Sequence, residues 1–242
     1  MVIAALLIGR KGSKGLSGKN TRILGGYPCF EWPMRAVTQV QGISSYWMNT
    51  DCEIMKQKAE EQDWQIISRP VELATDGALA EDVFVQSLAT MRDSKVDPDI
   101  LVLLMANAPT INSKLINDGI KILLDDPDAD SAVSCSRYNM WSPLRARILD
   151  SHGYLQPYLP FDQHPNSPEL SCDRDSQGDV WFADMGVSIV RSINIDNLDS
   201  GLLPQKWMGQ KIVPIANEGG LDIDYEWQCG QAEWWVNKLG TV

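Results

Sequence analysis

The sequence is short of basic side chains. Its 242 residues include 21 Lys or Arg against 32 Asp or Glu, so the formal net charge is −11, and two histidines cannot reverse the sign. A protein of this charge is repelled by nucleic-acid phosphates and by anionic lipid surfaces at physiological salt. We therefore expect no nucleic-acid partner and no membrane partner. Any phosphate-bearing ligand requires a local basic site.

Cysteines and long hydrophobic runs are also scarce. The five cysteines are odd in number, scattered and never in CxxC spacing, which excludes a disulfide scaffold and a cysteine metal cluster. The apolar run from Val2 to Ile8 is too short to span a membrane, and basic residues follow it rather than precede it as in a signal peptide. No Ser/His/Asp or Cys/His set is evident, because His152 and His164 lie beside turn residues. We expect a cytoplasmic protein.

Apolar runs alternate with helical patterns along most of the chain. A strand at Val2 to Ile8 is followed by a Gly-rich loop, and three further strand-then-helix pairs begin at Ser45, Trp64 and Ile100. Continuous apolar strands of this kind are typical of a parallel sheet covered on both faces. The length fits one large domain. The sequence thus predicts an α/β, doubly wound, mostly parallel sheet in a single domain, residues 1–242.

Two segments depart from this alternation. The Pro- and Asp-rich text from Tyr138 to Gly178 predicts a flap or insertion, and Tyr225 to Leu239 predicts a closing helix rich in tryptophan. We expect Trp227, Trp234 and Trp235 to pack this helix onto the sheet or onto a partner subunit, with cofactor stacking as the alternative.

The loop after the first strand carries most of the chemistry. Between Gly9 and Asn20 it holds four glycines and four basic residues, Arg10, Lys11, Lys14 and Lys19. Glycines let backbone N–H groups approach an anion, and the cations offset the charge of a polyphosphate. The loop is not a P-loop, because Ser13 and Asn20 stand where GxxxxGK[ST] needs Gly and Ser or Thr, and GxGxxG is absent. A nucleoside triphosphate is the expected ligand, and a mobile solvated loop is the alternative.

Two carboxylates near the end of the chain form a second pattern. In an extended strand Asp222 and Asp224 point to one face and Ile223 to the other, so the two carboxylates converge. Magnesium prefers such hard oxygen ligands and bridges them to substrate phosphates. We expect Asp222 and Asp224 to bind Mg²⁺, and the alternative is a helix N-cap at Asp224.

Four segments together resemble a known family. The stretch from Arg10 to Pro28, the run Arg69 to Asp76, the strand and loop from Leu103 to Pro109, and Leu221 to Asp224 look like the motifs of the cytidylyltransferases that activate sialic and other nonulosonic acids. These enzymes are related to the CMP-keto-deoxyoctulosonate synthetases. The resemblance implies a nucleotide-diphospho-sugar transferase, Rossmann-like fold. It also implies a homodimer in which the flap, 138–178, reaches the neighbouring active site.

The resemblance also assigns residues. It implies that the first loop holds the triphosphate of CTP, with Arg10, Lys19 and Asp224 as catalytic residues. By match, the other nucleotide-binding residues are Gly12, Ser13, Lys14, Asn20, Arg69 and Ala78. The expected contacts to a keto-sugar acid are Asn107, Arg145 and Asp184. The implied reaction joins the acid to CMP and releases pyrophosphate.

Two segments differ from the sialate-activating pattern. Where many relatives read Gln-Pro-Thr-Ser-Pro-Leu-Arg, this chain reads Met105 to Ile111, and Met185 replaces the Asn of a later Asn-Gly pair. A pocket without those donors is expected to use N-acetylneuraminate less well than some less polar or differently substituted keto-sugar acid, with Arg145 holding its carboxylate. Two alternatives remain: a non-catalytic nucleotide-sugar-binding relative, and a nucleotidyltransferase using another NTP and a sugar phosphate.

Overall fold

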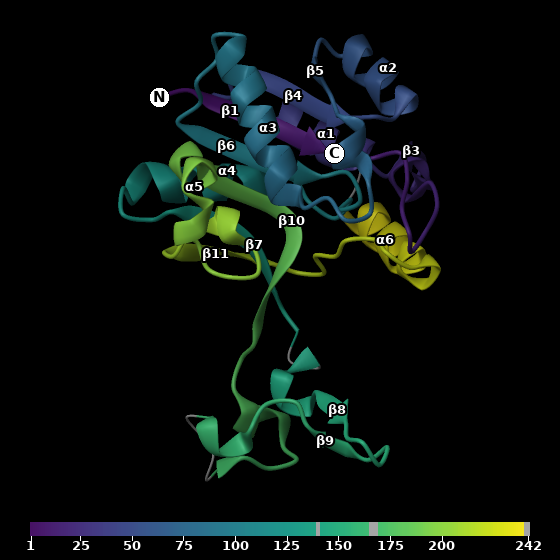
Figure 1. Ribbon diagram of the computed structural model, residues 1–242, viewed down its shortest axis with the longest axis vertical. Coiled ribbons are helices and arrows are strands. Elements are labelled where there is room, and N and C mark those ends of the chain that lie inside the picture. The colour runs from purple at the N-terminus through teal and green to yellow at the C-terminus, as the bar shows by residue number, and fades with distance from the viewer. Residues whose placement is uncertain (139–140, 165–168, 240–242) are drawn as a thin grey trace.

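A seven-stranded sheet forms the centre of the molecule (Figure 1), in the order β11-β7-β10-β6-β1-β4-β5. The computed structural model describes residues 1–138, 141–164 and 169–239. The strands of this sheet are β1 (Ile3–Ile8), β4 (Ser45–Thr50), β5 (Gln65–Ser68), β6 (Ile100–Met105), β7 (Ser131–Arg137), β10 (Trp181–Arg191) and β11 (Ile212–Asn217). Only β10 pairs antiparallel with its neighbours, β6 and β7. The predicted mostly parallel α/β sheet is confirmed.

Strand β1 lies in the middle of the sheet between β4 and β6. All six of its residues are buried, which explains why its sequence is apolar on both faces. Ala5 and Leu7 belong to one core cluster, whereas Ala4 and Leu6 belong to the other. Successive side chains of a strand point to opposite faces, so these two clusters are the two sides of the sheet.

Helices cover both faces. The first cluster contains residues of α1 (Glu31–Thr38), α2 (Glu53–Glu61) and α4 (Ser113–Asp125). The second contains residues of α3 (Ala80–Asp93) and α5 (Ser192–Asp196). Helix α4 begins as the sequence predicts, because Asn112 Oδ1 accepts a hydrogen bond from Leu115 N at 3.0 Å. None of the helices in the described ranges is long and apolar enough to cross a bilayer.

Helix α6 (Glu226–Leu239) packs beside a small hairpin of β2 (Ile23–Leu24) and β3 (Tyr27–Pro28). Its buried residues Cys229 and Ala232 share a cluster with Leu24 and Cys29. Trp227 and Trp234 are instead 61% and 57% exposed. The expectation that these two tryptophans pack onto the sheet is therefore wrong for the isolated chain, and packing onto a partner stays a prediction.

The segment between β7 and β10 extends away from the sheet as an arm, defined here as the described residues from Tyr138 to Val180 (Figure 1). It contains a hairpin of β8 (Arg147–Leu149) and β9 (Leu155–Pro157). The roots of the arm are held together where Trp181 pairs with Arg137. Its apolar residues Ile148, Leu149, Tyr154, Leu155 and Tyr158 are each more than half exposed.

Candidate active site

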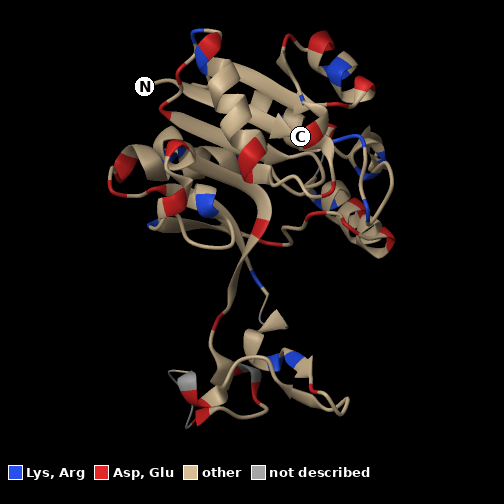
Figure 2. Cartoon of the chain, in the orientation of Figure 1, with Lys and Arg blue, Asp and Glu red and all other residues tan. Residues whose placement is uncertain are grey.

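A pocket opens at the carboxyl ends of the parallel strands. Gly9 follows β1, Arg69 follows β5 and Asn107 follows β6, and all three line it. The cavity has a volume of about 280 Å³. Ligands of open α/β sheets bind at this edge, because the loops that leave parallel strands converge there. Figure 2 shows that basic residues occur in the loops on this side of a largely acidic molecule.

The loop Gly9–Asn20 supplies the cations of this pocket. Arg10 Nη2 lies 2.7 Å from Asp76 Oδ1, and Lys14 Nζ lies 3.7 Å from the other oxygen of that carboxylate. The hydrogen bond from Arg10, supplemented by Lys14, lowers the pKa of Asp76. Lys19, only 14% exposed, forms an ion pair with Asp224. The carboxylates of Asp76 and Asp224 thus pair with the cations of this loop, and Asp224 also lines the pocket.

Asn20 fixes the shape of the loop. Its Nδ2 donates to the carbonyl of Arg10 at 2.8 Å, so the two ends of the loop are tied together. Its Oδ1 is buried and accepts no hydrogen bond from the described residues. A buried amide oxygen without a partner is costly, and a bound ligand that offers a donor would satisfy it.

Arg69 is held by a residue that sequence reasoning missed. Its Nε donates to Asn49 Oδ1 at 2.8 Å and its Nη2 donates to Asn49 O at 2.9 Å. The Asn49 amide in turn donates to Gln86 and to Ser87. Burial lowers the pKa of Arg69 to about 10. The signal available in the sequence is a polar asparagine near the carboxyl end of a predicted strand, and in the structure this side chain is fully buried.

The two carboxylates lie in an irregular segment, not in the predicted strand. Ile223 N donates to Asn107 O at 2.8 Å, and Asn107 Nδ2 donates back to Ile223 O at 3.2 Å. These bonds fix the segment against the end of β6, with Ile223 only 1% exposed. Asp224 does not form the alternative N-cap, because α6 begins at Glu226, so Tyr225 is the residue that precedes it, and the Asp224 carboxylate pairs with Lys19. The N–H groups of Asp224 and Tyr225 donate to Gln228 Oε1.

The surroundings of Asp222 and Asp224 suit a cation. Burial, followed by the charge of Asp224, raises the pKa of Asp222. A cation between the two carboxylates would relieve that repulsion. The described residues contain no group of three or more His, Cys, Asp or Glu able to hold a metal. A metal at this pair would therefore need water and phosphate oxygens to complete its coordination, which fits magnesium.

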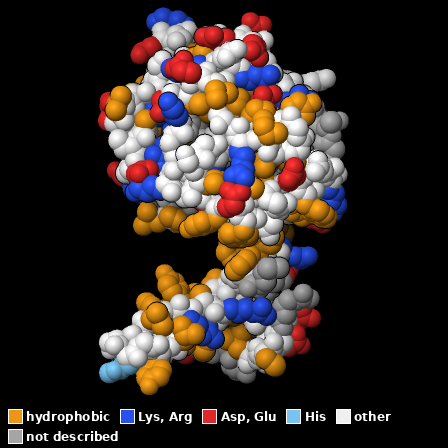
Figure 3. Space-filling model, turned by 90° about the vertical axis from the view of Figure 1, so that its right-hand side faces the viewer, with side chains coloured by type: hydrophobic (Ala, Val, Ile, Leu, Met, Phe, Trp, Pro, Cys, Tyr) orange, Lys and Arg blue, Asp and Glu red, His pale blue; other side chains and the backbone are white. Residues whose placement is uncertain are grey.

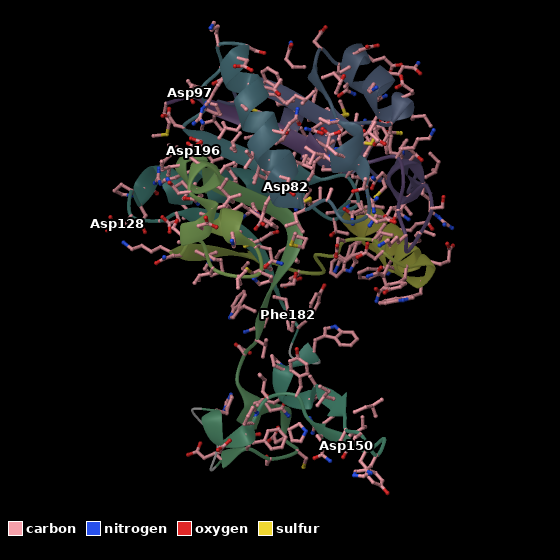
Figure 4. All side chains as sticks on the ribbon, in the orientation of Figure 1. Asp82, Asp97, Asp128, Asp150, Phe182 and Asp196 are labelled. Atoms are coloured by element: carbon pink, nitrogen blue, oxygen red, sulfur yellow. The ribbon has the colours of Figure 1, made fainter. Side chains whose placement is uncertain are left out.

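A second cavity of about 490 Å³ lies on the other side of the pair. Asp222 lines this cavity, whereas Asp224 lines the first. Its walls are aromatic, and they come from the root of the arm and from α6: Tyr138, Trp141, Phe182, Trp227 and Trp235. Figure 4 shows Phe182 where β10 leaves the sheet toward the arm. No Lys or Arg is among the described residues that line this cavity.

Asp184 joins the floor of the second cavity to the sheet. Its carboxylate accepts hydrogen bonds from Ser134 Oγ, from Ser136 Oγ at 2.8 Å, from Asn217 Nδ2 at 2.9 Å and from Gly186 N at 3.1 Å. A carboxylate has about four acceptor sites, so these donors occupy them all. The neighbouring Met185 has a left-handed φ of +57° at an irregularity in the β10–β7 pairing. A direct contact between Asp184 and a substrate stays a prediction.

The structure gathers most of the residues singled out by the sequence. The first pocket contains Arg10, Gly12, Ser13, Lys14, Lys19, Asn20, Arg69, Ala78, Asn107 and Asp224. Asp184 and Asp222 line the second cavity. Arg145 lies apart from both, on the arm, where it lines a separate hollow with Arg147 and Phe161. Sequence reasoning missed the aromatic wall.

Comparisons with known proteins identify the family of the chain. A family model described as Cytidylyltransferase matches residues 4–146. The N-acylneuraminate cytidylyltransferase of Oncorhynchus mykiss is 26% identical over 121 residues, which cover 50% of this chain and 27% of that protein. The enzyme of that name from Escherichia coli is 29% identical over 153 residues, or 63% of this chain and 35% of that protein. The chain thus matches only about a third or less of the length of these curated relatives.

Two solved structures share the fold. A CMP:2-keto-3-deoxy-manno-octonic acid synthetase complexed with CTP has a TM-score of 0.68 and 16% identity, and the match covers 99% of this chain and 100% of that one. The 4-diphosphocytidyl-2C-methyl-D-erythritol synthase of Anaerococcus prevotii has a TM-score of 0.60 and 12% identity, with 98% of each chain covered.

Proposed function

Because the chain belongs to the cytidylyltransferase family, we propose that it transfers the cytidylyl group of CTP to a keto-sugar acid of the nonulosonic class and releases pyrophosphate. The observation that carries the proposal is the meeting of two cavities at one pair of carboxylates, Asp222 and Asp224. One cavity is cationic and suits a triphosphate. The other is wide enough for an acceptor, since ligand cavities commonly measure about 300–1,000 Å³.

Binding of CTP replaces the internal anions of the first pocket. Triphosphate oxygens take the positions of carboxylates against Arg10, Lys14 and Lys19, and backbone N–H groups of the glycine-rich loop add further donors. Two hydrogen bonds to Asn49 fix Arg69 through its Nε and Nη2 atoms, and its Nη1 atom donates to the nucleoside. Lys19 and Arg10 stabilise the negative charge that builds on the leaving pyrophosphate.

Asp222 and Asp224 would hold Mg²⁺ together with phosphate oxygens and water. When bound, Mg²⁺ supplies charge neutralisation at the α-phosphate and lowers the pKa of a nearby hydroxyl. The acceptor hydroxyl oxygen forms a bond to the α-phosphorus while the bond to the bridging oxygen breaks. The electron pair leaves with pyrophosphate, and the hydroxyl proton passes to water. The contribution of the protein is positioning, because the segment fixed by Asn107 holds both carboxylates between the two substrates.

We also propose a cytoplasmic homodimer in which the arm completes a neighbouring site. The described residues that line the acceptor cavity include no cationic side chain, whereas a keto-sugar acid carries a carboxylate. Arg145 lies on the arm, and the apolar arm surface is exposed (Figure 3). Pairing of two arms would bury that surface and bring an arginine to the other chain. All five cysteines are free and four are buried, which suits a reducing compartment.

Pyrophosphate release tests the reaction. Purified protein is mixed with Mg²⁺, one of the four ribonucleoside triphosphates, and each of a panel of nonulosonic acids, octulosonic acids and sugar phosphates. We expect release only with CTP and a keto-sugar acid, and a CMP-sugar in equal amount. Release with a sugar phosphate, or CTP binding without release for every acceptor, would favour one of the two alternative functions.

Mixed dimers test the arm. Arg145→Ala and Lys19→Ala are each expected to be nearly inactive. After exchange of subunits at equal concentration, about half of the dimers are mixed, and each mixed dimer has one site with both residues intact. Activity should therefore return to about a quarter of the parent value. No recovery, with subunit exchange verified by light scattering and mass labels, would show that Arg145 does not act across the dimer.

A further inference from the structure

The segment that connects β5 to α3 forms part of the first pocket, and residues 70–79 of it are called the strap here. Both ends of the strap are anchored, because Leu73 and Ala80 pack against the second core cluster. Between these anchors, Asp76 and Gly77 are exposed, and a Cβ at Gly77 would have no neighbour within 4 Å among the described residues. Packing therefore does not hold the middle of the strap. Four strap residues line the pocket: Leu73, Thr75, Ala78 and Leu79.

The cations of the glycine-rich loop hold the strap instead. Arg10 contacts it at two points, since its Nη1 donates to Ala74 O at 3.3 Å and its Nη2 lies 2.7 Å from Asp76 Oδ1. Lys14 Nζ lies 3.7 Å from the second oxygen of the same carboxylate. One carboxylate thus binds two cations of the loop. The side chains of Arg10 and Asp76 are 27% and 42% exposed, so another anion can reach this pair and replace the carboxylate.

The contacts that Asp76 makes are those that a phosphate group would make. A guanidinium donates to carboxylate oxygens and to phosphate oxygens in the same fork-like geometry. Asp76 and a phosphate therefore compete for Arg10 and Lys14, and both cannot be bound to the same donors at once. The affinity of the pocket for a phosphate ligand is lowered by the free energy that is needed to displace Asp76.

We propose that Asp76 is an autoinhibitory residue of the first pocket. Its carboxylate occupies Arg10 and Lys14 while the pocket is empty, weakens the binding of CTP and of pyrophosphate, and returns to the two cations as pyrophosphate leaves. The inference rests on the proposed function, which supplies these two phosphate ligands. The expected effect is opposite to that of a residue that binds the ligand, because loss of the Asp76 carboxylate strengthens phosphate binding.

Inorganic pyrophosphate serves as the probe. Its affinity is measured by calorimetry without acceptor and without Mg²⁺, so that the result depends neither on turnover nor on the carboxylate pair. Asp76→Asn removes the charge with little change in shape, and we expect it to bind pyrophosphate about three- to tenfold more tightly than the parent. Asp76→Glu keeps the charge and should bind pyrophosphate as the parent does. In an Arg10→Ala background the gain from Asp76→Asn should shrink, because only Lys14 is left for the carboxylate to occupy.

Glu72→Gln is the matched control, because Glu72 is an exposed acid of the same strap that forms no ion pair within the described part of the chain. It should leave the affinity for pyrophosphate unchanged. An equal gain in Glu72→Gln would mean that only the net charge of the strap matters, and an equal gain in Asp76→Glu would mean that its shape matters. Either result would overturn the proposal, as would unchanged or weaker binding by Asp76→Asn or no binding of pyrophosphate to the parent.

The same measurements separate this inference from the proposed function. Tighter pyrophosphate binding by Asp76→Asn, in a protein that forms no CMP-sugar from any acceptor, would support the inference and refute the proposed reaction. Formation of a CMP-sugar by the parent, with no gain in affinity in Asp76→Asn, would refute the inference alone.

Discussion

The two cavities that meet at Asp222 and Asp224 are built in opposite ways. The nucleotide pocket takes its cations from one loop of twelve residues, Gly9–Asn20, and pairs them with carboxylates. The proposed acceptor cavity takes its aromatic rings from the root of the arm and from α6, and the part of its lining that the structure describes includes no Lys or Arg. Under the proposed function, the first pocket binds the same triphosphate in every reaction, whereas the acceptor in the second cavity differs between enzymes. We therefore propose that the chemistry depends on the loop and the specificity on the distant segments.

Lys19→Ala should give the largest effect and should confine it to the nucleotide side. Loss of a buried charged contact to the leaving group is expected to lower kcat about 100- to 1,000-fold. The Michaelis constant for the acceptor should hardly change. Lys11→Ala is the control, because Lys11 carries the same charge in the same loop but does not line the pocket. Similar losses in the two variants, measured by pyrophosphate release, would mean that only the net charge of the loop matters.

The same contrast explains what the sequence could predict. Strands such as β1 and the loop after it are local in sequence, so periodicity and composition were sufficient to predict them. The aromatic wall depends on the sheet order that brings Phe182 on β10 near Trp227 on α6, and no local pattern contains that order. Helix α1 was missed because it is short and contains Pro33, which is tolerated only in the first turn.

The carboxylate pair was predicted for a partly wrong reason. Asp222 and Asp224 were expected to share a face of a strand, but the segment is irregular and is held in place by two hydrogen bonds between Ile223 and Asn107. The pKa of Asp222, raised by burial and by Asp224, indicates that the carboxylates are nonetheless close enough to interact. Their role in binding Mg²⁺ stays a prediction.

Asp224→Asn tests the point at which the two cavities meet. Removal of one of two carboxylates should lower activity at least about tenfold at limiting Mg²⁺, with part of it regained at high Mg²⁺. Glu226→Gln is the control, since Glu226 is a nearby exposed acid that pairs with Arg22 instead. A magnesium titration of initial rates distinguishes them. Identical titration curves for Asp224→Asn and the parent would show that Asp222 and Asp224 do not bind the metal.

Arg69→Lys tests whether Arg69 binds the nucleoside of CTP in the first pocket. Lysine keeps the charge but cannot make the two bonds that Arg69 makes to Asn49 and still face the nucleoside. We expect the Michaelis constant for CTP to rise about tenfold with little change in kcat. Asn49→Ala should act in the same direction by releasing the guanidinium. A change in the Michaelis constant for the acceptor alone would show that Arg69 acts on the acceptor and not on CTP.

Asp184→Asn should have the smallest effect on catalysis and should act on the acceptor side alone. The new amide nitrogen would face two donors where the carboxylate accepts four hydrogen bonds, which costs about 1–3 kcal/mol of the free energy of unfolding. Urea denaturation measures this loss, and Asp128→Asn, at an exposed site near Lys211 (Figure 4), should be nearly neutral. Because Asp184 supports the loop at Gly220, the acceptor constant should rise while the CTP constant stays the same. A rise in the CTP constant instead would show that the two cavities are not independent.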